Sequence, residues 1–205
     1  GVRMATPSDV PGILDMISPL EVEGQFPQQA PLTKESIEMQ IGTFVVIERD
    51  GTIIACAQLR LGASELQAAE IARFVVHSEY QHQGKGTLML SWMERTALAK
   101  GVVNLIAVVP RSSSSWFLGR GFSRLTTTSL SQTLMGSSDA SARRKMNDRL
   151  LKSDVSSVQL LQNAHVDAET EDEADNLLSA DSGILLLKKL QSARAIDEED
   201  VLSRL

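Results

Sequence analysis

The stretch that decides the fold is residues 75–86, which read Val75-Val76-His77-Ser78-Glu79-Tyr80-Gln81-His82-Gln83-Gly84-Lys85-Gly86. An apolar strand runs here into a turn with two glycines, and the sequence after it predicts a helix over 87–100. A helix N-terminus offers several backbone N–H donors and the positive end of the helix dipole, which together suit a diphosphate. Glycines in such a turn permit positive φ or a close approach of main chain to ligand. The stretch therefore predicts a phosphate-binding turn, with an ordinary strand-to-helix loop as the alternative.

The spacing of the glycines narrows the kind of turn. A Rossmann fingerprint needs a third glycine at position 89, which is Met89, and a P-loop needs a hydroxyl residue directly after Lys85. What remains is Gln81-x-x-Gly84-x-Gly86, which resembles the Arg/Gln-x-x-Gly-x-Gly/Ala signature of the GNAT superfamily of acetyl-CoA-dependent N-acetyltransferases. In that family this turn binds the diphosphate of coenzyme A. The resemblance implies acetyl-CoA as co-substrate.

Composition excludes several other classes of protein. The chain has 205 residues, 42% of them hydrophobic, and a net charge of −6, so we expect one globular core and no general nucleic-acid surface. No apolar run approaches the roughly 20 residues of a membrane span, and we expect a soluble protein of the cytoplasm or of an organelle stroma or matrix. The single cysteine, Cys56, lies in an apolar run and is predicted to be a core residue. The histidines lack metal-ligand spacing, so we predict no metal site.

The order of elements predicts a mixed α/β sheet. Residues 43–49 and 52–59 are rich in β-branched side chains and flank Asp50-Gly51, a strong hairpin signal. Strands are predicted at 70–76 and 104–109, followed by a polar loop over 111–115 and a brief helical turn. The GNAT resemblance implies an α/β (α+β) fold whose central sheet is mixed and mostly antiparallel, with splayed strands 4 and 5 and flanking helices.

The chain divides into four predicted segments. Residues 1–125 match the GNAT core, and 126–182 form a polar and acidic insertion that we expect to be largely loop or disordered, with one helix. Residues 183–190 are expected to return as the final strand of the sheet, and 191–205 form a C-terminal tail. Because the chain opens on Gly1 rather than methionine, we expect a processed product or an excised domain.

Several segments indicate one branch of the superfamily. They are residues 2–10 with 12–14, Pro19-Leu20-Glu21, residues 44–57, residues 69–72 and 75–77, the glycine turn, and Trp116-Phe117 with Gly121-Phe122. In this order they resemble the acetyltransferase domain of the N-acetylglutamate synthases, the enzymes that begin arginine synthesis. The resemblance implies L-glutamate as the acceptor amine, an upstream amino-acid-kinase-like domain and a homo-oligomer. Two alternatives stay open: an acetyltransferase for another small amine or a protein N-terminus, and a catalytically degenerate module that binds coenzyme A in a regulatory role.

The resemblance assigns roles where positions match. The main chain of Phe74, Val75 and Val76 would contact the pantetheine arm, and the diphosphate would be held by Gln81, His82, Gln83, Gly84, Lys85, Gly86 and Thr87. Glu70 matches a glutamate that acts as general base, through a water molecule. A base is needed because an ammonium substrate must lose a proton before its nitrogen attacks. Since Glu70 begins an apolar strand that ends at the ligand turn, its side chain can face the cleft, with a solvated strand-end glutamate as the alternative.

The general acid is less well defined than the base. Many GNAT enzymes carry a tyrosine where Phe117 stands here, and the synthases share the Trp-Phe pair. The synthases use a hydroxyl or amide group near the end of the preceding strand instead. In this chain that region offers Ser112 and Ser113 as candidates, with a shifted register.

The substrate-binding positions also depart from the synthase pattern. The synthases place arginines in the loop after the first helix and just before the last strand, where this chain has Gln28 and residues 181–183. Glutamine cannot replace a guanidinium that forms a bidentate pair with a carboxylate. Arg73, close to Glu70, is the candidate that compensates. Arg111 is a second candidate. An ordinary surface cation is the alternative for both arginines and the preferred interpretation of Arg111.

Overall fold

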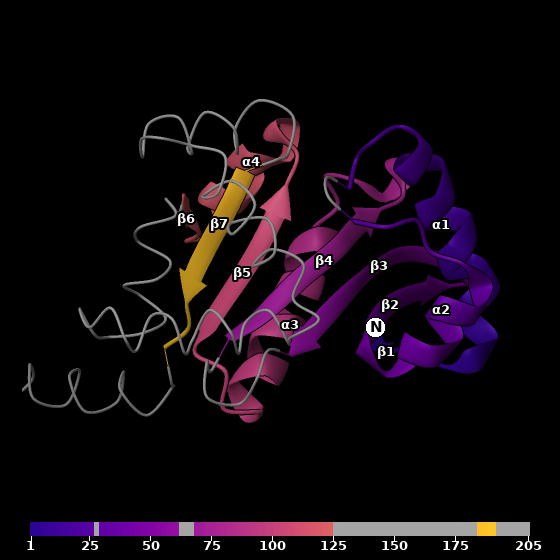
Figure 1. The fold of residues 1–205 in the computed structure, drawn as a ribbon, viewed down its shortest axis with the longest axis horizontal. Helices are drawn as coiled ribbons and strands as arrows, with labels where there is room; N and C mark the ends of the chain where they lie inside the picture. Colours follow the sequence, from indigo (N-terminus) through magenta and orange to yellow (C-terminus); the bar gives the residue numbers. More distant parts are fainter. Residues whose placement is uncertain (27–28, 62–67, 125–183, 192–205) are drawn as a thin grey trace, which may run out of the picture.

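The computed structural model describes residues 1–26, 29–61, 68–124 and 184–191. In these ranges seven strands form one sheet in the order β1-β2-β3-β4-β5-β7-β6, in which only β4 and β5 pair in parallel (Figure 1). The strands are β1 Val2–Met4, β2 Phe44–Arg49, β3 Thr52–Leu61, β4 Ala68–Val76, β5 Asn104–Val109, β6 Ser123–Arg124 and β7 Ile184–Lys189. The helices are α1 Val10–Val22, α2 Lys34–Gln40, α3 Lys85–Ala99 and α4 Arg111–Leu118, with short 3-10 turns at Pro7–Asp9, Ile41–Thr43 and Ser78–Tyr80. The predicted mixed and mostly antiparallel sheet is confirmed.

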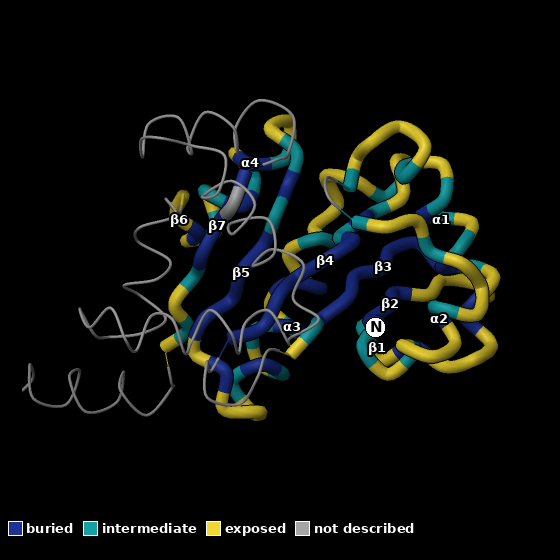
Figure 2. Tube along the Cα trace, viewed as in Figure 1, coloured by how far each residue is buried: buried dark blue, intermediate teal, exposed yellow. Residues whose placement is uncertain are grey.

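Helices cover both faces of the sheet and bury a separate hydrophobic cluster on each. On one face α1 and α2 contribute Val10, Ile13, Ile17 and Ile37. On the other face α3 and α4 contribute Met89, Leu90, Met93, Ala97 and Phe117. The central strands are therefore buried along most of their length (Figure 2). Apolar positions three and four residues apart along α3 produce this packing, as its sequence pattern predicts.

The hairpin between β2 and β3 follows from its two turn residues. Asp50 has φ of 53° and Gly51 has φ of 78°, the left-handed pair that matches the twist of the flanking strands. The antiparallel register runs from Arg49 opposite Thr52 to Phe44 opposite Gln58, with one irregularity after Ile47. This turn is thus the one that the sequence predicts.

Two irregularities of β4 open the sheet at one end. Opposite β3, the register shifts between Cys56 and Gln58, where two β4 residues, Arg73 and Phe74, lie opposite the single residue Ala57. Arg73 has a φ of 49°. Opposite β5, pairing extends only from Ala68 to Ile71. Beyond Ile71 the two parallel strands diverge, so the rest of β4 has an open edge (Figure 1).

Two predicted boundaries were wrong. The helix α3 begins at Lys85 rather than at residue 87. Gly84 is its N-cap and adopts a left-handed conformation, so that the helical conformation begins with the next residue. The polar loop predicted over 111–115 is the first half of α4, which begins after Pro110 and buries Ser114 and Phe117. Pro110 fixes an extended conformation directly before the helix, and the serines after it are compatible with its first turn.

The segments predicted after the core are described in part. β7 lies between β5 and β6 and is antiparallel to both. The predicted insertion at 126–182 and all but the first residue of the tail at 191–205 lie outside the described residues. No helix of the described part is both long and apolar enough to cross a membrane.

An ion pair fixes the start of α1 against β1. Arg3 donates to both carboxylate oxygens of Asp9, at 2.7 and 2.9 Å, and the Thr6 amide N–H donates to the same carboxylate at 2.7 Å. Asp9 is buried, and the hydrogen bonds from Arg3 hold the pKa of its carboxyl group well below the usual range. Since the folded carboxylate stays charged to lower pH than the unfolded one, its stabilisation is present above pH about 4 and is lost as the pH falls further.

We predict that Asp9→Asn lowers the free energy of unfolding by about 2 kcal/mol at neutral pH, the size of a lost charged hydrogen-bond pair. Urea unfolding at several pH values measures this difference, which should shrink as the pH falls below about 4. The control is Asp15→Asn, because Asp15 is an exposed residue of α1, the helix that Asp9 precedes. An equal loss for both variants, or a difference that does not change with pH, would contradict the assignment.

Candidate functional site

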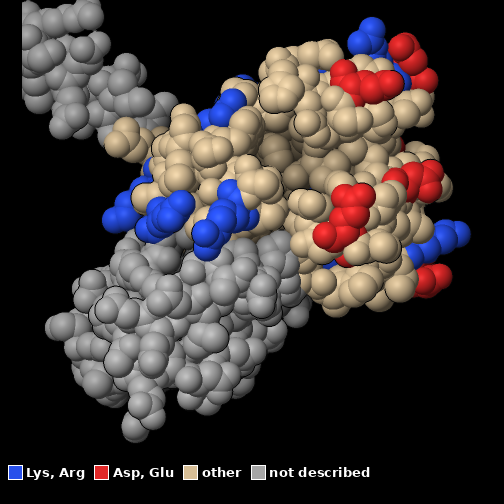
Figure 3. Space-filling model, turned by 90° about the horizontal axis from the view of Figure 1, so that it is seen from above, with Lys and Arg blue, Asp and Glu red and all other residues tan. Residues whose placement is uncertain are grey.

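A cleft of about 1460 Å³ lies where β4 and β5 diverge. Its walls come from α1 on one side and from the start of α4 on the other, and the glycine turn forms one end. Figure 3 shows a hollow between these two halves of the molecule, with the Asp and Glu side chains of this face on the half that carries α1. Most of the residues predicted to bind a ligand line it: Arg73, Phe74, Val75, Val76, Gln81, His82, Gly84, Lys85, Gly86, Thr87, Ser112 and Ser113. Gln83 and Glu70 do not line the cleft, and Gln28 lies outside the described residues.

The open edge of β4 forms the floor of the cleft. Val75 and Val76 pair with β3 on one side, while no β5 residue pairs with them on the other. The side chain of Phe74 turns toward α4 and packs against Trp116, with ring centroids 5.4 Å apart. The strand thus presents main-chain groups to a ligand while its side chains hold the walls in place.

The first turn of α3 has free amide donors. The first hydrogen bond into the helix runs from the amide of Leu88 to the carbonyl of Gly84, at 2.9 Å. The preceding amides, those of Lys85, Gly86 and Thr87, have no partner among the described residues, and no side chain caps the helix. Unsatisfied N–H groups at a helix N-terminus, combined with the helix dipole, bind anions well. The turn therefore has the donors that a diphosphate requires.

Glycine is needed at the two positions of the motif for different structural reasons. Gly84 has φ of 75°, and a Cβ atom there would meet no atom within 4 Å. Glycine is therefore favoured here by the backbone conformation and not by a lack of space. At Gly86 a Cβ atom would lie 3.1 Å from Cζ2 of Trp116. Gly86 is therefore required because α3 and α4 meet at this point, and the indole closes the cleft beside the free amides.

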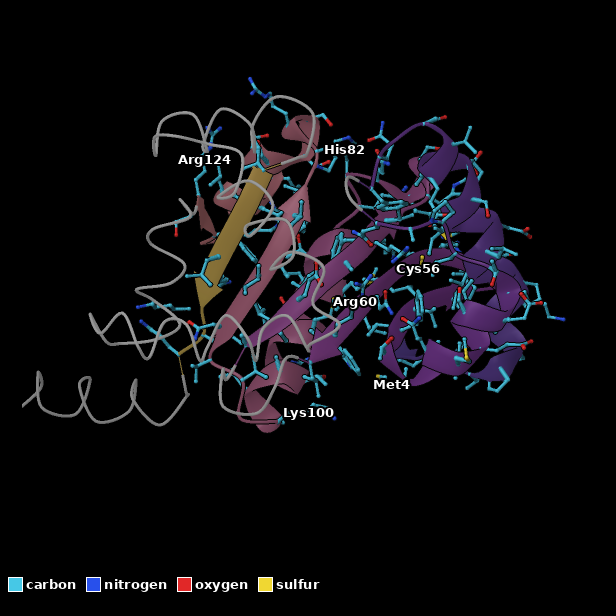
Figure 4. The ribbon with its side chains drawn as sticks, viewed as in Figure 1. Met4, Cys56, Arg60, His82, Lys100 and Arg124 are labelled. Carbon is cyan, nitrogen blue, oxygen red and sulfur yellow. The ribbon has the colours of Figure 1, made fainter. Side chains whose placement is uncertain are left out.

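The glutamine side chains of the turn support the main chain. The side-chain amide of Gln81 donates to the carbonyl of Val76 at 3.0 Å, and that of Gln83 donates to the carbonyl of Glu79 at 2.7 Å. Between them His82 is exposed and has φ of 59°, and it lies at the end of the sheet where the halves separate (Figure 4). These side chains hold the shape of the turn, which leaves its amides to the ligand.

The predicted base, Glu70, lies deeper than expected. It pairs with Ile106 in the part of β4 that still contacts β5, and only 1% of it is exposed. Its Oε2 lies 3.6 Å from Nη1 of Arg60, a residue of β3 seen near the middle of the sheet in Figure 4. The expectation that its side chain faces the cleft was wrong, because the strands diverge only after Ile71. Any proton transfer from a ligand in the cleft to Glu70 must therefore pass through a bridging group such as a water molecule.

Arg73 lines the cleft and belongs to a buried polar network. Its Nη1 donates to the side-chain oxygen of Gln29 at 2.7 Å, its Nη2 donates to the carbonyl of Ala30, and its Nε lies 3.3 Å from Oε1 of Glu21. Burial lowers the pKa of Arg73. The bulge in β4 directs this guanidinium toward the segment between α1 and α2, which it ties to the sheet.

The predicted acid candidates lie in the first turn of α4. Ser112 and Ser113 line the cleft wall opposite α1, and the amide of Ser113 donates to the carbonyl of Pro110 at 2.9 Å. Their hydroxyl groups come from a rigid helix rather than from a loop. The described residues contain no group of three His, Cys, Asp or Glu that could hold a metal ion.

Sequence reasoning missed two cleft residues, Trp116 as a wall of the phosphate end and Arg120 beside it. The pair Trp116-Phe117 contributes to the family resemblance in the sequence, whereas Arg120 has no predicted role. The one available signal was the position of Arg120 between two glycines, directly after a helix. That signal does not indicate which cleft the side chain enters.

Comparison with known proteins agrees with this geometry. Residues 13–116, half of the chain, match the model of the acetyltransferase (GNAT) family. The chain belongs to the GNAT family. One relative, an amino-acid acetyltransferase of Pasteurella multocida (strain Pm70), is 37% identical over 121 residues, 59% of this chain and 26% of that protein. Another, an amino-acid acetyltransferase of Pseudomonas fluorescens (strain Pf0-1), is 40% identical over 59% of this chain and 27% of that protein.

A solved structure shares the fold of this GNAT chain. N-acetylglutamate synthase from Neisseria gonorrhoeae, complexed with coenzyme A and N-acetyl-glutamate, matches with a TM-score of 0.63 and 21% identity, over 94% of this chain and 35% of that chain. The resemblance to the synthases is thus confirmed at the level of sequence relatives and fold. The chain spans about a quarter of the length of its curated relatives.

Proposed function

We propose that this chain binds acetyl-CoA in the cleft and transfers the acetyl group to the α-amino group of an amino acid, with L-glutamate as the first choice. The observation that carries the proposal is the continuity between the open edge of β4 and the uncapped start of α3. The diphosphate would bind the amides of Lys85, Gly86 and Thr87, and the pantetheine arm would run along Phe74–Val76. The thioester would then lie deeper in the cleft, toward Ile71.

The reaction requires one bond to form and one to break. The amine nitrogen attacks the carbonyl carbon of the thioester, a C–N bond forms, and the C–S bond breaks to release the thiol. The nitrogen must lose a proton and the sulfur must gain one. We assign the first transfer to Glu70 through a water molecule, and the second to the hydroxyl of Ser112 or Ser113 on the facing wall.

L-glutamate is supported as the acceptor by the relatives and by Arg73. The curated relatives are named amino-acid acetyltransferases, and the gonococcal synthase structure contains N-acetyl-glutamate. Arg73 is the cation that would bind a substrate carboxylate, and its position on the cleft wall suits this role. Gln28 is the second proposed contact. An upstream amino-acid-kinase-like domain and assembly into a homo-oligomer belong to the same proposal.

Glu21 favours a second candidate, an acetyltransferase for a different small amine or for a protein N-terminus. Its carboxylate lies 3.3 Å from Arg73 and also accepts from the amide of Leu32 at 3.1 Å. Part of the charge of Arg73 is therefore already neutralised inside the protein. A dicarboxylate would gain less from this guanidinium than from one without such a neighbour.

Thiol release from acetyl-CoA, measured with a panel of acceptors, tests the proposal. The panel contains glutamate, glutamine, aspartate, a neutral primary amine and a short peptide with a free N-terminus, and a reaction without acceptor is the blank. We expect release above the blank with glutamate, and N-acetylglutamate as the product by mass spectrometry. Release only with other acceptors would support the second candidate. No release despite measurable binding of coenzyme A would refute both and favour a regulatory module.

A further inference from the structure

Arg120 is a cation at the phosphate end of the cleft that lies outside the glycine motif. It follows α4 in the turn that leads to β6, and it lines the cleft together with Thr87 and Trp116. It therefore comes from a different part of the chain than the amides of α3. The fold brings the two together, because Arg120 contacts Thr87 in the first turn of α3.

Contacts on three sides fix the guanidinium of Arg120. Its Nε and Nη2 donate to the hydroxyl oxygen of Thr87 at 3.3 and 3.0 Å, and its Nη1 donates to the carbonyl of Trp116 at 2.9 Å. Its Cζ lies 3.8 Å from the centroid of the Trp116 ring. A guanidinium stacked on an indole and held by hydrogen bonds has lost its rotamer freedom on folding, so little entropy remains to be lost on binding.

No carboxylate of the described residues forms an ion pair with Arg120. Within the described ranges its partners are a hydroxyl and a carbonyl, whereas the guanidinium groups of Arg3, Arg60 and Arg73 each lie within 4 Å of a carboxylate. Arg120 also lies beside the first turn of α3, where the helix dipole is positive and a cation is unfavourable. Both costs disappear when an anion binds between the guanidinium and the free amides.

We infer that Arg120 binds the diphosphate of coenzyme A together with the neighbouring α3 amides, an inference that rests on the proposed function. The position of Thr87 favours the diphosphate over the 3′-phosphate as the group that Arg120 binds. The hydroxyl oxygen of Thr87 accepts from Arg120, and its amide is one of the free donors proposed to bind the diphosphate. Since that oxygen already accepts, the hydroxyl hydrogen of Thr87 is available to the same anion. Trp116 acts as a positioning residue that holds the guanidinium flat.

Calorimetric titration of Arg120→Gln with three ligands tests the inference. The ligands are coenzyme A, dephospho-coenzyme A, which lacks the 3′-phosphate, and pantetheine, which lacks the diphosphate. We expect the affinity for the first two to fall by the same factor, about 10- to 100-fold, the loss of a charged hydrogen-bond contact. The affinity for pantetheine should not change. Arg120→Lys keeps the positive charge but lacks the planar set of guanidinium donors, and it should recover part of the loss.

The matched control is Arg95→Gln, which removes an exposed arginine of α3 that does not line the cleft. It should leave all three affinities unchanged, and thermal unfolding with a circular dichroism readout shows that each variant is folded. A loss confined to coenzyme A would place the guanidinium on the 3′-phosphate and overturn the inference. Unchanged affinity of Arg120→Gln for coenzyme A would overturn it while leaving the proposed function intact. A wild-type chain that binds neither coenzyme A nor dephospho-coenzyme A would overturn both.

Discussion

The variant Gly84→Asp is expected to fold as the wild type does and to bind coenzyme A about 100-fold more weakly or worse. A Cβ atom at this position would meet no protein atom within 4 Å, and residue 84 lines the cleft directly before the residues with the free amides. A carboxylate there repels the diphosphate, and two like charges about 4 Å apart near a protein surface repel by about 4 kcal/mol. Calorimetry with coenzyme A measures the loss of affinity.

The matched control for this variant is Gly84→Asn. Asparagine and aspartate have nearly the same shape, and both tolerate the left-handed conformation that residue 84 adopts, with φ of 75°. Asparagine carries no charge, so we expect it to weaken binding by a few-fold only. Similar affinities of the Asp and Asn variants would show that no anion is bound at this helix terminus.

Glu70→Gln is expected to lower the turnover number about 100-fold or more, the usual contribution of a general base. The affinity for coenzyme A should stay within a few-fold of the wild type, because Glu70 does not line the cleft and lies away from the glycine turn. Initial rates at saturating acetyl-CoA and acceptor measure the change. They should be recorded over a range of pH, since a lost base also changes the shape of the pH profile.

The control for Glu70 is Glu94→Gln. Glu94 is a glutamate of α3 that pairs with Lys188 at 2.7 Å and does not line the cleft. Its replacement should leave the turnover number unchanged. Glu70→Gln with the wild-type rate at every pH would show that this residue balances the charge of Arg60 and takes no part in proton transfer. The stability of both variants is checked by thermal unfolding.

The elements that could be predicted are those whose signal is local. Asp50-Gly51 forces a hairpin because both residues adopt positive φ, and the spacing of Met89, Met93 and Ala97 gives α3 one buried face. The starts of α3 and α4 were misplaced by a few residues. Glycine and proline indicate that a boundary is near, but the exact residue depends on how the cap packs.

The long-range features of the site could not be predicted in the same way. The cofactor turn was found because its glycine spacing lies within one short segment. The depth of Glu70 depends on where β4 leaves β5, and the position of Arg73 depends on a bulge opposite β3. Arg120 reaches the cleft only because α4 packs on Gly86 through Trp116. Such placements result from contacts between segments that are distant in sequence, which no local pattern encodes.

A titration of the isotopically labelled protein, followed through its backbone amide NMR signals, tests the central claim most directly. If a diphosphate binds the start of α3, coenzyme A should shift the signals of Lys85, Gly86 and Thr87 more than those of other residues, while pantetheine should leave these three signals in place. Unmoved signals of these three residues at saturating coenzyme A would contradict the account.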